Sequence, residues 1–315
     1  MTEITLNVLP IFLLIFSGWA LVRSRFLNVD IGDALSEFVF KVAVPVLLLH
    51  TITQADFQGA SPFRLWIAYF AGVGVTWTIG HLVATRVFGR DQRIGVLAGV
   101  SSAFANNVFI GLPLVSRMLG NDGIVALSIL LAVHLPLMMV IGTVLMEHAE
   151  RRESGVQLRG MLAVLRQVGR NLVTNPLVIG LAIGLMVHVI GLPIPATIET
   201  VLSQISAMAG PAALISLGMA LTKYRVTGNV GIASVTSALK LVLMPASVWM
   251  ACYLLHLPHE WTMALVLTSS VPTGVNAWLI ANRFGVGHAL AASTITITTA
   301  LGVFSVTFWA WLLGA

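Results

Sequence analysis

Long runs of apolar residues, separated by short polar stretches, cover almost the whole of the 315-residue chain. A helix that crosses a bilayer needs about 20 predominantly apolar residues. On that template the pattern predicts an all-α integral membrane protein with ten transmembrane helices. The predicted spans cover residues 4–22, 31–52, 63–88, 94–118, 123–146, 172–191, 197–221, 228–255, 260–282 and 288–312.

The composition agrees with a chain embedded in lipid, because 57% of the residues are hydrophobic and 9% are charged. Soluble domains carry about 25% charged residues. The first apolar run is too long for a signal-peptide core and follows Glu3 instead of basic residues, so we expect it to remain as a span. The single cysteine, Cys252, excludes an internal disulfide and a cysteine-rich metal site. The net charge of +5 is not gathered in a basic run interleaved with aromatic residues, so we expect membrane lipid and no nucleic acid as a partner.

The lysines and arginines indicate an orientation, since cytoplasmic loops of membrane proteins carry an excess of both. With the N-terminus outside, the ten spans place most of these residues in cytoplasmic loops and leave Arg64 and Arg117 on the opposite side. Lys41 and Lys240 fall inside spans. Both termini are therefore predicted to be non-cytoplasmic. The polar stretch 147–171 is predicted to be a cytoplasmic linker, in preference to a short amphipathic helix on the inner membrane surface.

An internal repeat divides the chain into two halves of five spans. The matching residues, at a shift of 166 to 168 positions, are Pro10 with Pro176, Gly18 with Gly184, Leu35 with Leu202, and Ser101-Ser102 with Ser269-Ser270. Five spans reverse the direction in which the second half enters the membrane, so the repeat would be inverted, which is the usual build of secondary transporters. We therefore predict a first repeat at 1–146, a linker at 147–171 and a second repeat at 172–315.

The fourth and ninth spans contain polar and helix-breaking residues at matching places, which in such transporters points to the substrate site. Pro272 lacks an N–H group, and Gly274 removes side-chain restraint. Asparagine amides can pair the freed backbone and still reach a ligand, while the N-terminus of a half-helix suits a carboxylate. The candidate substrate-binding residues are Ser102, Asn106, Asn107, Pro272, Thr273, Gly274, Asn276 and, on the eighth span, Lys240.

These two segments also carry a family resemblance. The run from Asn106 to Gly111-Leu112-Pro113, together with Pro272-Thr273-Gly274-Val275-Asn276-Ala277 and the following Ala281-Asn282-Arg283-Phe284-Gly285, resembles the auxin efflux carrier family. That family includes bacterial malonate permease-like proteins and the plant auxin exporters, which have a proline where Ala105 stands here. The resemblance covers essentially the whole chain. It implies a scaffold of spans 1, 2, 6 and 7, a moving transport part of spans 3–5 and 8–10, and discontinuous helices 4 and 9 that cross beside a site for a small carboxylate. We also expect a homodimer through the scaffold helices, in a bacterial cytoplasmic (inner) membrane.

Ionisable side chains inside spans need a partner or a role, because a charge at the bilayer centre costs at least about 2.5–3.5 kcal/mol. Asp33, Glu37 and Lys41 are spaced four apart on one face. This spacing predicts an internal ion pair or, alternatively, a coupling site in which Glu37 binds a proton or Lys41 faces the substrate anion. Lys240 would balance the carbonyl ends of the crossing half-helices or pair with the substrate carboxylate. Histidine titrates near physiological pH in general, but a lone intramembrane histidine such as His134 is more often simply hydrogen-bonded.

These observations favour a secondary transporter that moves a small organic anion, such as malonate or an auxin-like acid, by alternating access of an elevator type. A cation/proton antiporter of the same fold would require a carboxylate in the broken segments, which contain none. A channel stays open as a further alternative. His259-Glu260 lacks the second histidine of a zinc protease motif and no Walker A sequence occurs, so we expect no enzyme and no cofactor. H⁺ and Na⁺ are the candidate coupling ions.

The predicted orientation can be tested by labelling single cysteines introduced at positions 2 and 155. We expect position 2 to react with an impermeant reagent in intact cells and position 155 to be protected, because the basic residues place 155 inside. External labelling of position 155 would contradict the topology.

Overall fold

The computed structural model describes residues 2–55, 61–154, 161–224, 228 and 230–314, and this part of the chain is built almost entirely from helices. The N-terminal half contains α1 (Thr2–Arg23), α2 (Val29–Phe38), η1 (Val39–Ala43), α3 (Val44–Thr53), α4 (Pro62–Leu82), η2 (Val83–Val87), α5 (Gln92–Ala103), η3 (Asn107–Gly111) and α6 (Leu112–Ser154). The remainder contains α7 (Met161–Val173), α8 (Pro176–Ile190), α9 (Ala196–Leu221), α10 (Val230–Ala238), η4 (Leu239–Leu243), α11 (Met244–Leu254), α12 (His259–Ser270), α13 (Asn276–Phe284) and α14 (His288–Leu313).

Within the described residues, seven helices are long and apolar enough to cross a membrane, so the chain is a multi-pass membrane protein. The expected spans near 94–118, 172–191 and 260–282 are not complete helices of this kind. Two of them are interrupted, which leaves α5 and α12 with 12 residues each, and α8 has only 15 residues. The expected fourth and fifth spans meet inside α6, where Gly120 has a φ of 60° and a ψ of −145°, outside the helical region. Only glycine adopts such a positive φ readily.

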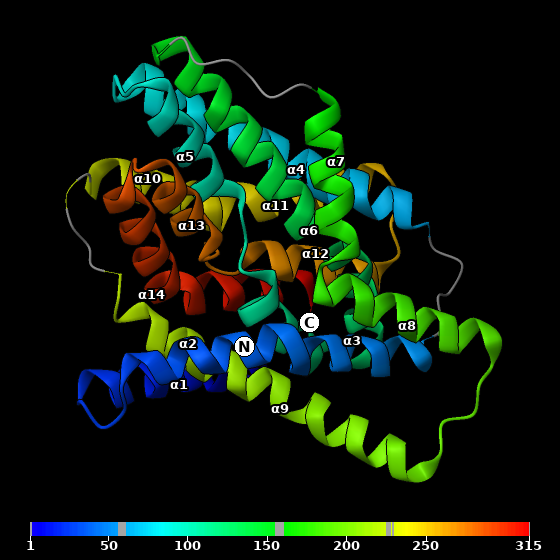
Figure 1. The fold of residues 1–315 in the computed structure, drawn as a ribbon. Coiled ribbons are helices and arrows are strands. Elements are labelled where there is room, and N and C mark those ends of the chain that lie inside the picture. Colours follow the sequence, from blue (N-terminus) through cyan, green and yellow to red (C-terminus); the bar gives the residue numbers. More distant parts are fainter. Residues whose placement is uncertain (1, 56–60, 155–160, 225–227, 229, 315) are drawn as a thin grey trace.

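The helices form two groups (Figure 1). α1, α2, α3, α8 and α9 make a flat layer in which α1 packs along α9 and α3 packs along α8. α4–α6 and α10–α14 form a thicker bundle, in which α4 packs on α11, α6 on α12, and α10 on α14. We call these groups the layer and the bundle.

Small residues let the helices of the layer approach each other closely. Gly18 of α1 lies against the backbone of Ile215 in α9, and Gly184 of α8 lies against the backbone of Leu49 in α3. A methyl group at either glycine would overlap these backbone atoms, as is common where membrane helices pack through small residues. The two contacts correspond to each other, because a shift of 166 positions converts Gly18 into Gly184 and Leu49 into Ile215.

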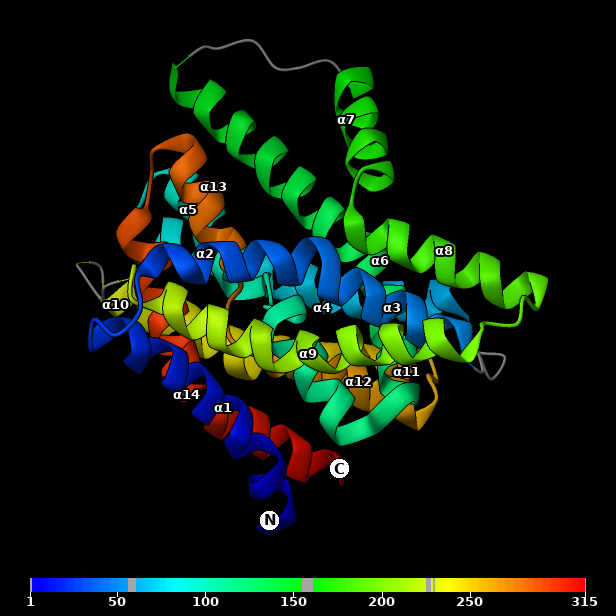
Figure 2. The ribbon, with the colours of Figure 1, turned by 60° about the horizontal axis from the view of Figure 1, so that its bottom comes forward.

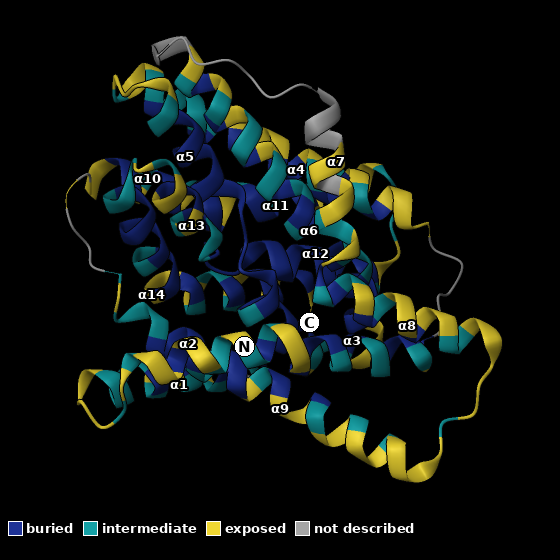
Figure 3. Cartoon of the chain, viewed as in Figure 1, coloured by how far each residue is buried: buried dark blue, intermediate teal, exposed yellow. Residues whose placement is uncertain are grey.

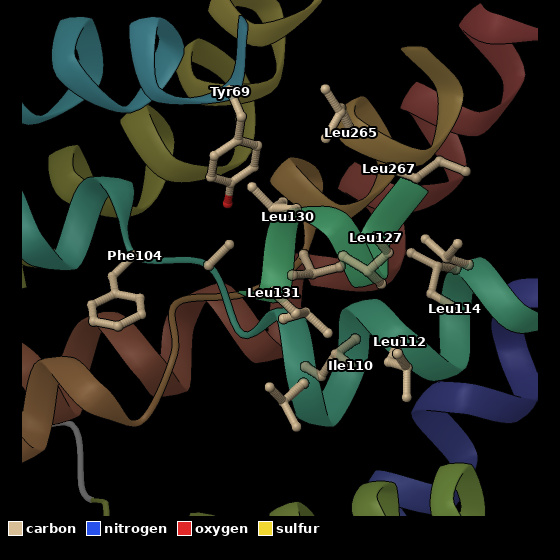
Figure 4. Close-up of a cluster of buried hydrophobic side chains, with 14 of the residues drawn as sticks. Tyr69, Phe104, Ile110, Leu112, Leu114, Leu127, Leu130, Leu131, Leu265 and Leu267 are labelled. Carbon is tan, nitrogen blue, oxygen red and sulfur yellow. The ribbon is translucent and has the colours of Figure 1, made fainter. Parts of the chain in front are cut away.

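The core of the bundle is apolar and closely packed. Leu127, Leu130 and Leu131 of α6 meet Leu265 and Leu267 of α12 (Figure 4), and all five are fully buried. The outer faces of the layer are instead strongly exposed (Figure 3), with large apolar side chains such as those of Leu6, Val189 and Ile198. A soluble protein rarely exposes so much contiguous apolar surface, and lipid accounts for it here.

Much of the segment predicted as a linker is helical. α6 continues to Ser154, past the predicted boundary at residue 146, and α7 occupies residues 161–173. Figure 2 shows α7 at the end of the molecule away from both termini. Position 155 lies outside the described residues.

The ion pair predicted between Glu37 and Lys41 on the second span forms, but it does not lie inside the bundle. Lys41 Nζ does lie 2.5 Å from Glu37 Oε1, but both side chains are more than 60% exposed. Asp33 pairs instead with Lys223, at the end of α9.

The close contacts of the layer predict a specific loss of stability. Gly18→Val and Gly184→Val should each lower the melting temperature in detergent by several degrees, because overpacking a close contact costs about 1–3 kcal/mol or more. Gly74→Val is the matched control, since a Cβ at this helical position meets nothing within 4 Å. Equal melting temperatures for all three variants would show that the close helix approach is unimportant.

Candidate functional site

Two interrupted helices cross at the centre of the bundle. α5 ends at Ala103 and α12 ends at Ser270, and the chain continues from each as a short extended segment. The segments form an isolated antiparallel bridge in which Asn106 N–H donates to the Pro272 carbonyl at 3.0 Å, and Gly274 N–H donates to the Phe104 carbonyl at 2.7 Å. These bonds satisfy backbone groups that cannot stay unpaired in an apolar surrounding. Gly274 suits the contact because its α-carbon lies close to the backbone of the opposite segment.

The last carbonyls of the two half-helices accept from different donors. Thr273 Oγ1 donates to the Ser101 carbonyl at 2.7 Å, whereas Lys240 Nζ donates to the Ser269 carbonyl at 2.5 Å. Lys240 is fully buried and is not among the residues that line the cavity described below. Of the two roles considered for Lys240, the contact made in this structure is the one with the carbonyl end of a half-helix, where a cation is stabilised by the helix dipole.

A cavity of about 470 Å³ lies beside the crossing. This volume is within the range of small-molecule sites. The cavity is lined by Phe40, Phe104, Ala105, Asn106, Asn107, Val108, Phe109, His134, Leu135, Pro136, Met139, Asn171, Thr174, Asn175, Pro176, Val275, Asn276 and Leu279. No lysine, arginine, aspartate or glutamate is found among these described lining residues, so charge selection must come from helix ends, amides and His134.

Three helix N-termini border the cavity. The continuous helix η3–α6 begins at Asn107, α8 begins at Pro176, and α13 begins at Asn276. The side chains of Asn106 and Asn175 cap the first two by accepting from Phe109 N and Leu177 N. Helix N-termini carry a partial positive charge and unpaired N–H groups. The three ends together make this cavity electrostatically favourable for an anion.

The three asparagines predicted from the broken segments differ in what they can offer a ligand. Asn107 is engaged by the protein, because its Nδ2 donates to the Tyr69 hydroxyl at 3.0 Å and its Oδ1 accepts from Thr268 at 3.0 Å. Asn106 uses only Oδ1, for the helix cap. Within the described part of the chain, Nδ2 of Asn106 and the side-chain amide of Asn276 have no protein partner. These two amides are therefore the donors that a ligand could meet.

The chain matches the model of a family described as "Membrane transport protein" over residues 3–310. It belongs to the auxin efflux carrier family. Similar relatives include a protein of Rhizobium meliloti (strain 1021) named "Putative malonate transporter", which is 26% identical over 98% of this chain and 95% of its own length. An "Uncharacterized transporter" of Methanothermobacter thermautotrophicus is 26% identical over 97% of both chains, and the transporter YfdV of Escherichia coli K12 is 20% identical over 96% of this chain and 95% of its own length.

Only some of the residues predicted for the site of this carrier line the cavity. Asn106, Asn107 and Asn276 do so. The other predicted residues hold the crossing together or lie elsewhere: Ser102 donates to the Ala98 carbonyl in its own helix, Pro272, Thr273 and Gly274 form the backbone bridge, Lys240 caps α12, and Glu37 and Lys41 form the exposed pair.

Other residues that line the cavity or support the crossing were not predicted as site residues. Phe40 and Asn175 line the cavity although they lie on the second and sixth spans, far in sequence from the broken helices. The asparagine before Pro176, at the start of an apolar run, is a helix N-cap signal that could have identified Asn175. Thr298 of α14 supports the crossing by accepting from Thr273 N at 3.1 Å. His134 lines the cavity itself.

Proposed function

We propose that this membrane transport protein is a secondary transporter that moves a small organic anion by elevator-type alternating access. The observation that carries the proposal is the cavity beside the crossing, where three helix N-termini and the amides of Asn106 and Asn276 meet without a charged side chain among the described lining residues. Such a site attracts a carboxylate through N–H donors and partial charges. A small dicarboxylate such as malonate suits the cavity and is the compound named for the relative from Rhizobium meliloti.

An inverted repeat of 1–146 and 172–315, with ten membrane crossings, is part of the proposal. Two observations support it. The bonds Asn106 N to Pro272 O and Gly274 N to Phe104 O exchange with each other under the same shift of 168 positions that relates Ser101 to Ser269. The glycine contacts of the layer exchange under a shift of 166. A pseudo-two-fold axis through the bridge would produce both sets of paired contacts.

The layer would be the scaffold of the elevator and the bundle its moving part. A second cavity of about 500 Å³ lies between the two groups on the other side of η3, with lining residues from α1, α3, α6 and α9. Asn106 to Phe109 line the first cavity, while Leu112 and Pro113 line the second. Space on both sides of one crossing is what a sliding bundle needs in order to expose the site alternately.

The first cavity includes Asn171 and Thr174, next to the basic central segment, so we assign it to the cytoplasmic side. The structure would then represent an inward-facing state. Both termini lie together at the opposite end in Figure 2, which agrees with an even number of crossings and non-cytoplasmic termini. We further propose the bacterial inner membrane as the location and a homodimer through the scaffold helices, whose outer apolar surface is extensive.

A cation/proton antiporter of the same fold is the weaker candidate. Such a protein needs a carboxylate at the crossing to bind its cation, and the described residues that line either cavity include no aspartate or glutamate. Arg117, the charged residue in the lining of the second cavity, is a cation and would repel one.

The side-chain amides of Asn106 and Asn276 allow a direct test of this proposal. Asn106→Ala and Asn276→Ala should each weaken malonate binding about tenfold or more, because a hydrogen bond to a charged acceptor contributes about 1.5–3 kcal/mol. Calorimetry on the purified full chain measures the affinity, with a panel of small carboxylates and indole acids as alternative ligands. Asn282→Ala is the matched control, since Asn282 lies on the same helix α13 with an exposed side chain. Unchanged affinity in both cavity variants would place the ligand elsewhere.

A further inference from the structure

The first cavity contains one titratable side chain among its described lining residues, that of His134 on α6. We propose that His134 is the proton-binding group of this transporter, so that one H⁺ enters the cavity with each substrate anion. This inference rests on the proposed function, because it assumes that the cavity binds a carboxylate. The proposed proton-binding residue is almost fully buried, because only 2% of the surface of His134 is exposed.

The ring of His134 is held by aromatic neighbours and by one polar contact. The rings of Tyr69 and Phe104 lie edge-on to the imidazole, with centroid distances of 5.4 and 5.2 Å, and the ring of Phe70 stacks at 6.4 Å. The Tyr69 hydroxyl lies 3.5 Å from Nε2, at the outer limit of a hydrogen bond. These contacts hold the ring at the cavity wall, and the described residues supply no stronger polar partner for it.

Because of the charges around His134, its protonation is expected to depend on the binding of an anion in the cavity. Of the groups that face it, Tyr69 is neutral at physiological pH, and no carboxylate occurs among the described cavity residues. The buried ammonium group of Lys240, which donates to the Ser269 carbonyl, is a like charge that opposes a positive imidazole. An imidazolium in the empty cavity would therefore be buried without compensation, which is costly. A bound carboxylate supplies the missing negative charge, so protonation and anion binding favour each other.

The proton step involves the imidazole of His134 and its neighbour Tyr69. One H⁺ from the solution binds to the lone pair of a ring nitrogen, and no other bond forms or breaks. The protonated ring has two N–H donors. Nε2–H can donate to Tyr69, whose oxygen has a second lone pair beside the one that accepts from Asn107 Nδ2. When the anion leaves, the proton leaves with it, and the ring returns to its neutral form.

A hydrogen-bonded chain connects this proton site to the broken helices. Tyr69 of α4 accepts from Asn107 at the start of η3, and Asn107 in turn accepts from Thr268 of α12. The distances of the two bonds are both 3.0 Å, and all three side chains are buried. A change of charge at His134 would thus act on both half-helices that form the crossing, which is where a transported ion must be sensed.

The test is the pH dependence of malonate binding to the purified full chain, at about pH 7 and about pH 8, where malonate itself is already ionised. If one H⁺ is taken up, the affinity should fall about tenfold between these values, because each released or bound proton changes the binding constant tenfold per pH unit. Calorimetry in two buffers of different ionisation enthalpy should count about one proton per malonate. The affinity falls as the pH rises because the proton is bound in the complex and absent in the free protein.

Variants separate the coupling role from a structural one. His134→Gln keeps a polar side chain but cannot titrate, so both the pH dependence and the proton uptake should disappear while some malonate binding remains. Glu37→Gln and His81→Gln should retain both, since neither residue lines the cavity. If His134→Gln is unstable, His134→Asn takes its place, and proton uptake that persists in the stable variant would overturn the coupling role of His134. Malonate binding by the wild type without proton uptake would overturn the coupling role and leave the proposed function intact, whereas failure of every carboxylate to bind would overturn both.

Discussion

The structure depends on how the backbone groups freed by two helix interruptions are paired. A broken helix in an apolar surrounding leaves N–H and C=O groups that would each cost several kcal/mol if unpaired. Here each interrupted segment pairs with the other, through Asn106 with Pro272 and Gly274 with Phe104. The remaining carbonyl ends accept from Thr273 and Lys240. The partners named here all lie inside the bundle, so these bonds of the crossing do not depend on the layer.

This pairing determines what remains for a ligand. The backbone bridge and Lys240 satisfy the acceptor-rich ends of the half-helices, while the donor-rich N-termini of η3–α6 and α13 open towards the cavity. α8 adds a third N-terminus from the layer. The site is therefore biased towards anions by helix ends, although the buried cation sits behind it. Among the described lining residues, the one titratable side chain is that of His134, where a bound anion would balance an added proton.

The sequence was sufficient to predict the helical membrane class, the family and the positions of both interruptions, because proline, glycine and asparagine have strong local effects on a helix. It was not sufficient to predict side-chain roles that depend on neighbours. Spacing alone left Lys240 with two possible partners, and a carbonyl of α12 proved to be the one it contacts. The pair of Glu37 and Lys41 formed as its spacing predicts, but its exposed position depends on neighbouring helices and was not predicted. Asn107 looked equivalent to Asn106, yet Tyr69 and Thr268, which are distant in sequence, occupy its amide.

The central claim is that the bundle moves as one body against the layer. It is tested most directly by spin-label distances in a transporting sample, with Cys252 replaced. One label pair joins the two groups, at Val201 of α9 and Phe304 of α14, and the control pair lies within the bundle, at Phe304 and Tyr253 of α11; all three side chains are exposed. We predict that malonate shifts the population between two distances of the first pair that differ by several ångströms, while the control pair keeps one distance. A single unchanged distance between Val201 and Phe304, in protein that transports malonate, would contradict the account.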